Sequence, residues 1–187
     1  MRIEIAAPLT KETAASLRAG DSVSISGVIY SARDAAHKKL CELIEKGEAF
    51  PFPIDGSLIY YMGPSPAQPG AVIGAAGPTT SYRMDPYAPR LLSLGSLGMI
   101  GKGRRSAEVI EAMKKSGAVY FGAVGGAGAL LQRCIRKAEV VCWPELGAEA
   151  LMRLEVHRLP AIVIIDSLGC DLYETGPRDY LTQHGGD

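Results

Sequence analysis

Residues 77–106, GPTTSYRMDPYAPRLLSLGSLGMIGKGRRS, form the stretch around which the rest of the chain is organised. Pro78 can occupy the first position of a short helix, where its missing N–H costs nothing. Pro86 would end that helix one residue earlier, because proline disfavours a helical residue before it. Thr79 and Arg83 are four residues apart, so they would share one face of such a helix.

Further along, the apolar run 97–100 leads to Lys102 and Gly103 and then to a helix whose N-cap is expected at Ser106. A hydroxyl, a guanidinium, an ammonium and a helix N-terminus could therefore converge on one point. Such a group of donors and positive charges is suited to binding a carboxylate. The alternative is a proline-bounded loop followed by a solvated helix start.

Alternation of apolar and polar residues, or a continuous β-branched run, predicts strands elsewhere in the chain. These strands are expected at residues 2–5, 22–30, 57–62, 118–123, 139–142, 151–156 and 161–165. Helices are expected at 10–17 (a helix or a turn), from 34 to about 46, over 106–116, and after a glycine-rich turn at 122–128. The last of these would carry Leu130, Leu131, Cys134 and Ile135.

Three residues are informative in the segment that joins the strand expected at 22–30 to the helix expected from residue 34. Gly27 inside a strand suggests a bulge or a close backbone approach, and Asp34 is a natural N-cap for a helix that Gly47 would close. Arg33 therefore lies between a strand end and a helix N-terminus, where open α/β sheets often place ligand-binding groups. The eight-residue segment GPSPAQPG at 63–70 is interpreted as a stiff connector, with a hinge or a wall of the site as the alternative.

Composition sets limits on the class of protein. The chain has 187 residues, which suggests one domain over 1–187 with a tail that frays from about residue 181. Lys and Arg together number 20 and equal Asp plus Glu, so no overall field would recruit nucleic acid or an anionic membrane. The apolar runs are too short to span a bilayer, and the N-terminus lacks a signal-peptide block. We expect a cytoplasmic protein.

The sequence lacks the patterns typical of metal and nucleotide sites. The four cysteines at 41, 134, 142 and 170 form no C-x-x-C pair, and the three histidines have no ligand spacing, so we expect the chain to bind no metal by itself. Cys41 and Cys134 are expected as buried thiols on helices. The glycine turn at 122–128 contains no G-x-G-x-x-G, and Gly101-Lys102 lacks the remainder of a P-loop. The basic cluster 102–105 lacks the aromatic residues typical of nucleic-acid binding.

The motifs SG (26–27), ARDAAH (32–37), GPTTSYRMD (77–85), KGRRS (102–106), the glycine turn and PELG (144–147), in this order, resemble the β part of class I iron–sulfur fumarases and of the related tartrate dehydratases. The resemblance covers roughly residues 24–171. It implies an α/β fold, a swivelling β/β/α domain with mixed sheet flanked by helices. It also implies reversible addition of water across a dicarboxylate double bond.

The same resemblance implies the site residues. Arg33, Thr79, Arg83 and Lys102 would contact the substrate, with Thr79 as the candidate for proton transfer. The matching residues Asp34, His37, Asp85 and Ser106 are expected to support them. The resemblance places a [4Fe–4S] cluster on a partner α subunit and no cofactor on this chain. The assembly would be a hetero-oligomer such as α2β2.

Three functions are compatible with this pattern. The first is the β subunit of a fumarate hydratase, which converts fumarate and (S)-malate and is active only with its α subunit. The second is the β subunit of an L-tartrate dehydratase, which these motifs do not distinguish from the first. The third is a non-catalytic module that binds carboxylates or phosphates.

Overall fold

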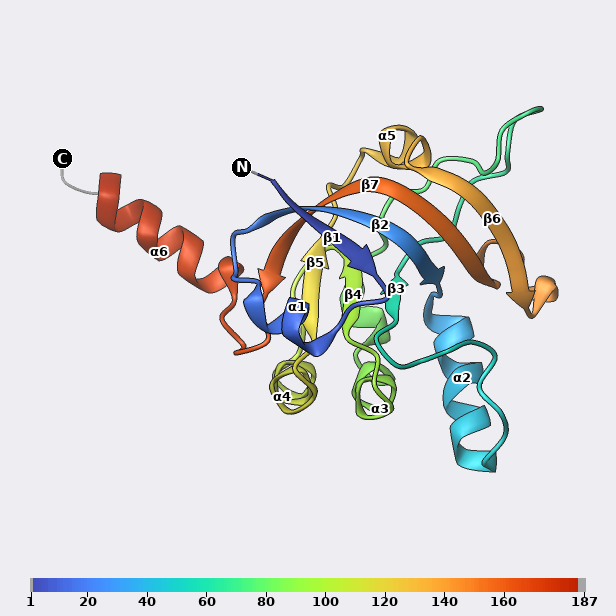
Figure 1. Ribbon diagram of the computed structural model, residues 1–187, viewed down its shortest axis with the longest axis horizontal. Helices are drawn as coiled ribbons and strands as arrows, with labels where there is room; N and C mark the ends of the chain where they lie inside the picture. Colours follow the sequence, from blue (N-terminus) through green and yellow to red (C-terminus); the bar gives the residue numbers. More distant parts are fainter. Residues whose placement is uncertain (1, 185–187) are drawn as a thin grey trace.

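The computed structural model describes residues 2–184 (Figure 1). Its strands are β1 (Ile3–Ala7), β2 (Ser22–Ser31), β3 (Leu58–Tyr60), β4 (Gly98–Gly101), β5 (Val119–Gly122), β6 (Ile135–Cys142) and β7 (Leu151–Ile165). Its α-helices are α1 (Lys11–Ser16), α2 (Asp34–Lys46), α3 (Ala88–Ser93), α4 (Ala107–Ser116), α5 (Gly128–Gln132) and α6 (Leu172–His184), and its 3₁₀ helices are η1 (Ser81–Met84) and η2 (Pro144–Glu149). The expected α/β class, with a mixed sheet flanked by helices, is confirmed.

The sheet is curled, with strand order β1-β2-β3-β4-β5-β7-β6. Strands β1 to β5 pair in parallel, whereas β7 runs antiparallel to β2, β5 and β6. Because β7 pairs with both β2 and β5, the strands β2, β3, β4, β5 and β7 close into a ring. Figure 1 shows β2, β7 and β6 arching over β3, β4 and β5, with α2, α3 and α4 on the far side.

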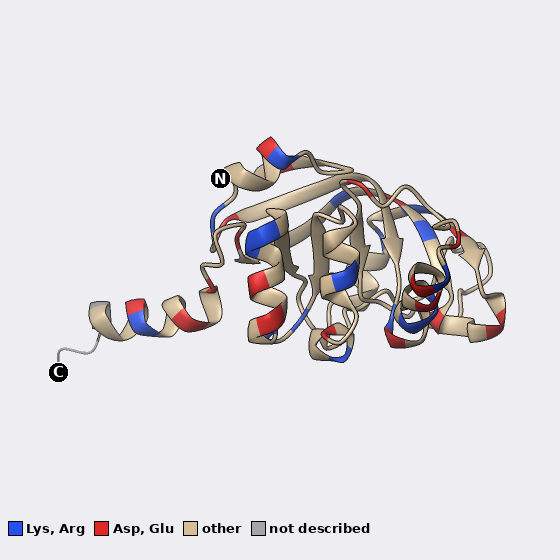
Figure 2. Cartoon of the chain, turned by 90° about the horizontal axis from the view of Figure 1, so that it is seen from below, with Lys and Arg blue, Asp and Glu red and all other residues tan. Residues whose placement is uncertain are grey.

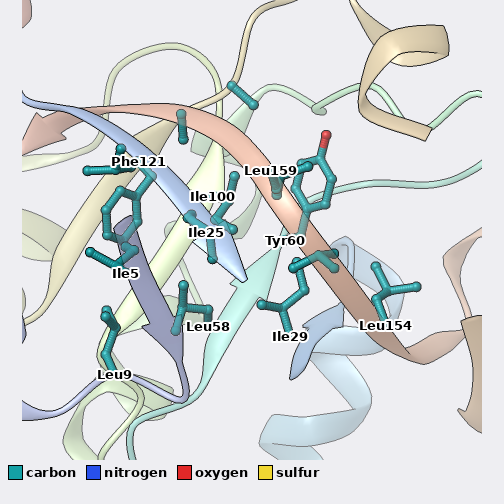
Figure 3. Close-up of a cluster of buried hydrophobic side chains, with 14 of the residues drawn as sticks. Ile5, Leu9, Ile25, Ile29, Leu58, Tyr60, Ile100, Phe121, Leu154 and Leu159 are labelled. Carbon is teal, nitrogen blue, oxygen red and sulfur yellow. The ribbon is translucent and has the colours of Figure 1, made fainter. Parts of the chain in front are cut away.

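This curl produces two hydrophobic cores. One lies inside the ring and includes Ile25, Leu58, Phe121 and Leu159, all completely buried or nearly so (Figure 3). The other lies between the sheet and the helices, with Leu40 of α2, Leu91 of α3 and Val109 of α4 among its members. Alternate side chains of the middle strands enter opposite cores, since successive residues of a strand point to opposite faces.

Gly27 shows why strand β2 needs a glycine at this position. Its φ is +121°, and a Cβ there would lie 2.3 Å from the carbonyl oxygen of Ala7 on the neighbouring strand β1. The β2–β7 register also shifts between Ile25 and Gly27. The predicted bulge and close approach are both confirmed.

Several predicted elements are wrong in extent. The segments 151–156 and 161–165 form one strand of 15 residues, because the residues between them make a bulge, with Arg158 at φ +54°, opposite the register shift of β2 and do not end the pairing. The strand expected at 139–142 begins at Ile135 and is mostly accessible, since it pairs only with β7 at the sheet edge. Helix α5 ends at Gln132, so Cys134 lies beyond it and is only half-buried.

Two helices were not predicted. Helix α3 has Pro89 in its first turn, and α6 contains Pro177. Helix α6 extends away from the body in Figure 1 and covers residues 181–184, whereas residues 185–187 of the expected frayed tail lie outside the described part of the chain. No helix within residues 2–184 is long and apolar enough to cross a membrane.

Charge on the helices follows their dipoles. Helix α4 has Glu108 in its first turn and Lys114 and Lys115 in its last, the arrangement that complements a helix macrodipole. Figure 2 shows basic and acidic segments interleaved along the helices of this side. The Ser106 N-cap is confirmed, since its hydroxyl accepts a bond from the Val109 amide, and Gly117 closes the helix in the left-handed conformation.

Candidate active site

The candidate site consists of Arg33, Thr79, Arg83 and Lys102, at the carboxyl ends of the parallel strands. Arg33 follows β2, and Lys102 follows β4. The segment bearing Thr79 and Arg83 lies between them: the Thr79 amide donates to the Tyr61 carbonyl at 2.7 Å, just beyond β3. Thr80 then forms an isolated parallel bridge with Lys102. The sheet thus brings together all four residues at the edge where α/β proteins commonly bind ligands.

The turn that carries Arg83 differs from the predicted helix. Pro78 forms a bridge with Met62 and Thr80 one with Lys102, which holds residues 78–80 extended. Helix η1 therefore begins only at Ser81, and the prediction that Thr79 and Arg83 share one helix face is wrong. The predicted end is confirmed, since Asp85 is the C-cap, directly before Pro86.

Arg83 is joined to the start of α2. Its Nη2 donates to Asp34 Oδ2 at 2.8 Å, and Asp34 Oδ1 lies 3.8 Å from Nη2 of Arg33. The Arg83 side chain remains 40% exposed, compared with 20% for Arg33. One carboxylate thus lies between the two guanidinium groups, and Arg83 is the more open of the two to a ligand.

Asp34 is not the N-cap of α2, contrary to expectation. The helix starts at Asp34 itself, with Arg33 in the extended cap position and no side-chain bond to the helix from that residue. The free amide of Ala35 instead donates to Glu149 Oε2 at 3.2 Å. Glu149 comes from the end of η2, so a distant carboxylate caps the helix and Asp34 is free to pair with Arg83.

Glu149 also binds Arg33 directly. Its Oε1 lies 3.0 Å from Arg33 Nη2. The other side of this guanidinium packs against Gly63, where a Cβ would lie 3.0 Å from Nη1. Arg33 Nε is buried, and none of the described residues forms a hydrogen bond with it. Glu149 has no signal in the local sequence, because a pairing between segments so far apart depends on the curl of the sheet.

His37 lies completely buried beneath the site. Its Nδ1 is 2.9 Å from the Arg33 carbonyl oxygen, so Nδ1 carries the proton. Burial lowers the pKa of His37 to about 4, so the ring is neutral at neutral pH. Nε2 has no hydrogen-bond partner in the described part of the chain, and the ring packs edge-on against Tyr61 at 5.2 Å between centroids. His37 thus supports the backbone of Arg33.

Lys102 supplies the least compensated charge of the site. Among residues 2–184 no carboxylate forms an ion pair with its ammonium group. The glycine turn after β5 lies beside it, since a Cβ at Gly125 would be 3.7 Å from Lys102 Nζ. Thr79 and Lys102 are both partly exposed. This places a hydroxyl and an ammonium at the same accessible edge.

Asp85 and Ser106 lie behind this edge with a residue that sequence reasoning missed. Asp85 accepts bonds from Arg105 Nε and the Ser106 amide, each at 2.7 Å. Arg105 is buried whereas Arg104 is exposed, so the basic cluster at 102–105 is not one surface patch. The basic residues of KGRRS are evident in the sequence, but their order does not show which of the two arginines points inward.

Two guanidinium groups, an ammonium and a hydroxyl on one edge can bind a small dianion. Arginine offers paired donors in a planar fork that matches a carboxylate, and lysine adds a single compact charge. Within the described residues, no three His, Cys, Asp or Glu side chains are grouped so that they could hold a metal ion.

Comparison with known proteins shows which family the chain resembles along its length. The family model described as "Fumarase C-terminus" matches residues 1–176. Over 154 residues the chain is 43% identical to an aerobic class I fumarate hydratase of Salmonella typhimurium, a match that covers 81% of this chain and 27% of that protein. It is 40% identical over 156 residues to fumarate hydratase 2 of Leishmania major, covering 82% of this chain and 28% of the relative.

A shorter relative matches along most of its length. The chain is 37% identical over 172 residues to a Methanocaldococcus jannaschii protein provisionally named L(+)-tartrate dehydratase subunit beta, covering 89% of this chain and 88% of that protein. By contrast, the chain spans only 27–28% of the two fumarate hydratases above.

Proposed function

Because the chain belongs to the fumarase C-terminal family, we propose that it is the β part of a hydro-lyase that reversibly hydrates fumarate to (S)-malate. The observation that carries the proposal is the assembly of Arg33, Thr79, Arg83 and Lys102 at one sheet edge, through the Thr80–Lys102 bridge and the Arg83–Asp34 bond. These are the groups that a dicarboxylate substrate requires.

Each residue has a proposed role. Arg83, with the more exposed guanidinium, holds one substrate carboxylate through charge-assisted hydrogen bonds. Arg33 and Lys102 provide positive charge on either side of it. Thr79 holds or transfers a proton at its hydroxyl, and the neighbouring cations favour its deprotonated form. Asp34 orients Arg83, and His37 supports the backbone of Arg33.

We propose that a partner subunit supplies the iron–sulfur cluster. Since the described residues offer no metal-binding group, we place the [4Fe–4S] cluster on an α subunit that meets this chain at the candidate site. The name "subunit beta" of the Methanocaldococcus relative supports a separate partner. A cytoplasmic α2β2 assembly is the form we propose.

A second candidate function is L-tartrate dehydration. The match that spans 88% of the Methanocaldococcus relative favours it, since the fumarate hydratases are matched over a much smaller share. Both reactions add or remove water at a dicarboxylate, so the same carboxylate-binding residues would serve either reaction. A non-catalytic carboxylate-binding module is the third possibility.

Co-expression with the candidate α subunit under anaerobic conditions tests all three. We expect the complex, and not this chain alone, to hydrate fumarate. Turnover of tartrate in place of fumarate would select the second function. An inactive complex, together with measurable dicarboxylate binding by the isolated chain, would support the binding module. Robust fumarate hydration by the metal-free chain alone would refute the need for a partner.

A further inference from the structure

Arg105 is an arginine enclosed beneath the candidate site. Its side chain is completely buried, and its guanidinium carbon lies over two aromatic rings, 5.3 Å from the centre of Tyr61 and 5.1 Å from that of Tyr120. Nη1 contacts the sulfur of Met99 at 3.1 Å, and Nη2 has no hydrogen-bond partner among residues 2–184. Burying a guanidinium group has a large desolvation cost. An apolar side chain would fill the same space without that cost, so filling space does not explain an arginine here.

The charged contact of Arg105 fixes one end of η1. Arg105 Nε donates to Asp85 Oδ1 at 2.7 Å, and Asp85 Oδ2 accepts the Ser106 amide at the same distance. Asp85 is the C-cap of η1, two residues after Arg83. The end of the turn that bears Arg83 is thereby attached to the start of α4.

Tyr120, the second ring beneath Arg105, fixes the other end of η1. Its hydroxyl donates to the Gly103 carbonyl at 2.9 Å, so it must accept the proton of Ser81 Oγ, 2.8 Å away. Ser81 Oγ in turn accepts the Lys102 amide at 3.1 Å. One continuous chain of bonds therefore runs from Lys102 through Ser81 and Tyr120 to Gly103.

We propose that Arg105 is a positioning residue, which holds η1 in register with Lys102 so that Arg83 and Lys102 face the same substrate. The proposal rests on the proposed function for the identity of that substrate. Arginine suits the task because its planar group can stack on both rings while Nε points along the plane to Asp85. Lysine cannot make both contacts.

The first test measures order in the chain itself, without any partner. Amide hydrogen exchange is compared among wild type, Arg105→Met, Arg105→Lys and the matched control Arg104→Met, which changes an exposed arginine. We expect the Ser106 and Lys102 amides to exchange at least about 10-fold faster in Arg105→Met, with amides of β1 and β2 unchanged. Arg104→Met should match wild type. Unchanged exchange at Ser106 and Lys102 would overturn the proposal.

The second test measures catalysis in the reconstituted complex. Misplacement of a substrate-binding group by about 1 Å can lower activity about 10²-fold, so we expect such a fall in kcat/KM for Arg105→Met and no more than about 2-fold for Arg104→Met. If Arg105→Met does not fold, Arg105→Lys, which keeps the charge and loses the fork, provides the comparison.

The outcomes separate this inference from the proposed function. Faster exchange together with normal kcat/KM would overturn the positioning role, because the disorder would not affect the reaction. An inactive wild-type complex would refute the proposed function, and the exchange data would then still decide whether Arg105 orders η1.

Discussion

Gly101→Ala is expected to disturb the candidate site through a single overlap. Gly101 ends β4, and its φ is not positive, so alanine meets no backbone strain there. A Cβ at this position would, however, lie 2.1 Å from Ser81 Oγ and 3.1 Å from Tyr61 Cδ2. Because the Ser81 hydroxyl bonds both Lys102 and Tyr120, moving it separates η1 from the end of β4.

The expected loss of stability follows from these contacts. Overpacking of this kind costs about 1–3 kcal/mol, and each of the two lost hydrogen bonds contributes about 0.5–1.5 kcal/mol. Gly101→Ala should therefore lower the free energy of unfolding by about 2–6 kcal/mol. Ser81→Ala, which loses only the hydrogen bonds, should cost about 1–3 kcal/mol.

A double-mutant cycle by urea unfolding tests this reasoning. With Ser81→Ala in place the overlapping oxygen is absent, so adding Gly101→Ala should cost less than about 1 kcal/mol, a strong departure from additivity. Gly125→Ala is the matched control, since its Cβ would lie 3.6 Å from Lys102 Cδ, an ordinary contact, and should change stability by less than about 0.5 kcal/mol. Additive costs in the cycle would refute the argument.

Three other changes test the site. Arg83→Lys keeps the charge and loses the fork, so kcat/KM of the complex should fall by about 10-fold or more; normal steady-state kinetics would exclude a clamp. Thr79→Val should lower kcat by about 10²-fold with little change in KM if the hydroxyl transfers a proton, whereas a normal kcat would restrict Thr79 to binding. Burial lowers the pKa of His37 from 6.5 to about 4, so below pH 6.5 the unfolded chain takes up a proton that the folded chain does not. Stability should fall by about 3 kcal/mol as pH drops from 6.5 to 4, and His37→Gln should remove that part of the pH dependence in urea unfolding.

Local signals in the sequence predicted most of the framework. Alternation located most of the strands, and the expected cap residues Ser106 and Gly47 do mark helix ends. The rule that ligand groups lie where a strand is followed by a helix N-terminus pointed to Arg33, which does follow β2 and precede α2. These predictions succeeded because each depends on residues that are neighbours in the chain.

The errors have a different origin. Pro78 is compatible with a helix start, but its bridge to Met62 from the strand β3 region holds it extended. Asp34 is compatible with an N-cap, but Glu149 arrives from 114 residues beyond Ala35 to cap the helix. Arg104 and Arg105 are identical in type, and Arg105 is the buried one because it meets Asp85 and the Tyr61 and Tyr120 rings, which come from other segments of the chain. Contacts between distant segments leave no pattern in a single sequence.

The pairing of Arg33 with Glu149 and of Arg83 with Asp34 reduces the positive charge that the proposed site offers to a ligand. Each guanidinium group already holds a carboxylate of the same chain through one nitrogen, so we expect an incoming dianion to share these groups with Asp34 and Glu149. We therefore expect the free chain to bind dicarboxylates weakly, since two of the three cations of the proposed site are already partly neutralised. Selectivity would then come from the geometry of both substrate carboxylates together, because neither carboxylate alone meets a full positive charge at these two arginines.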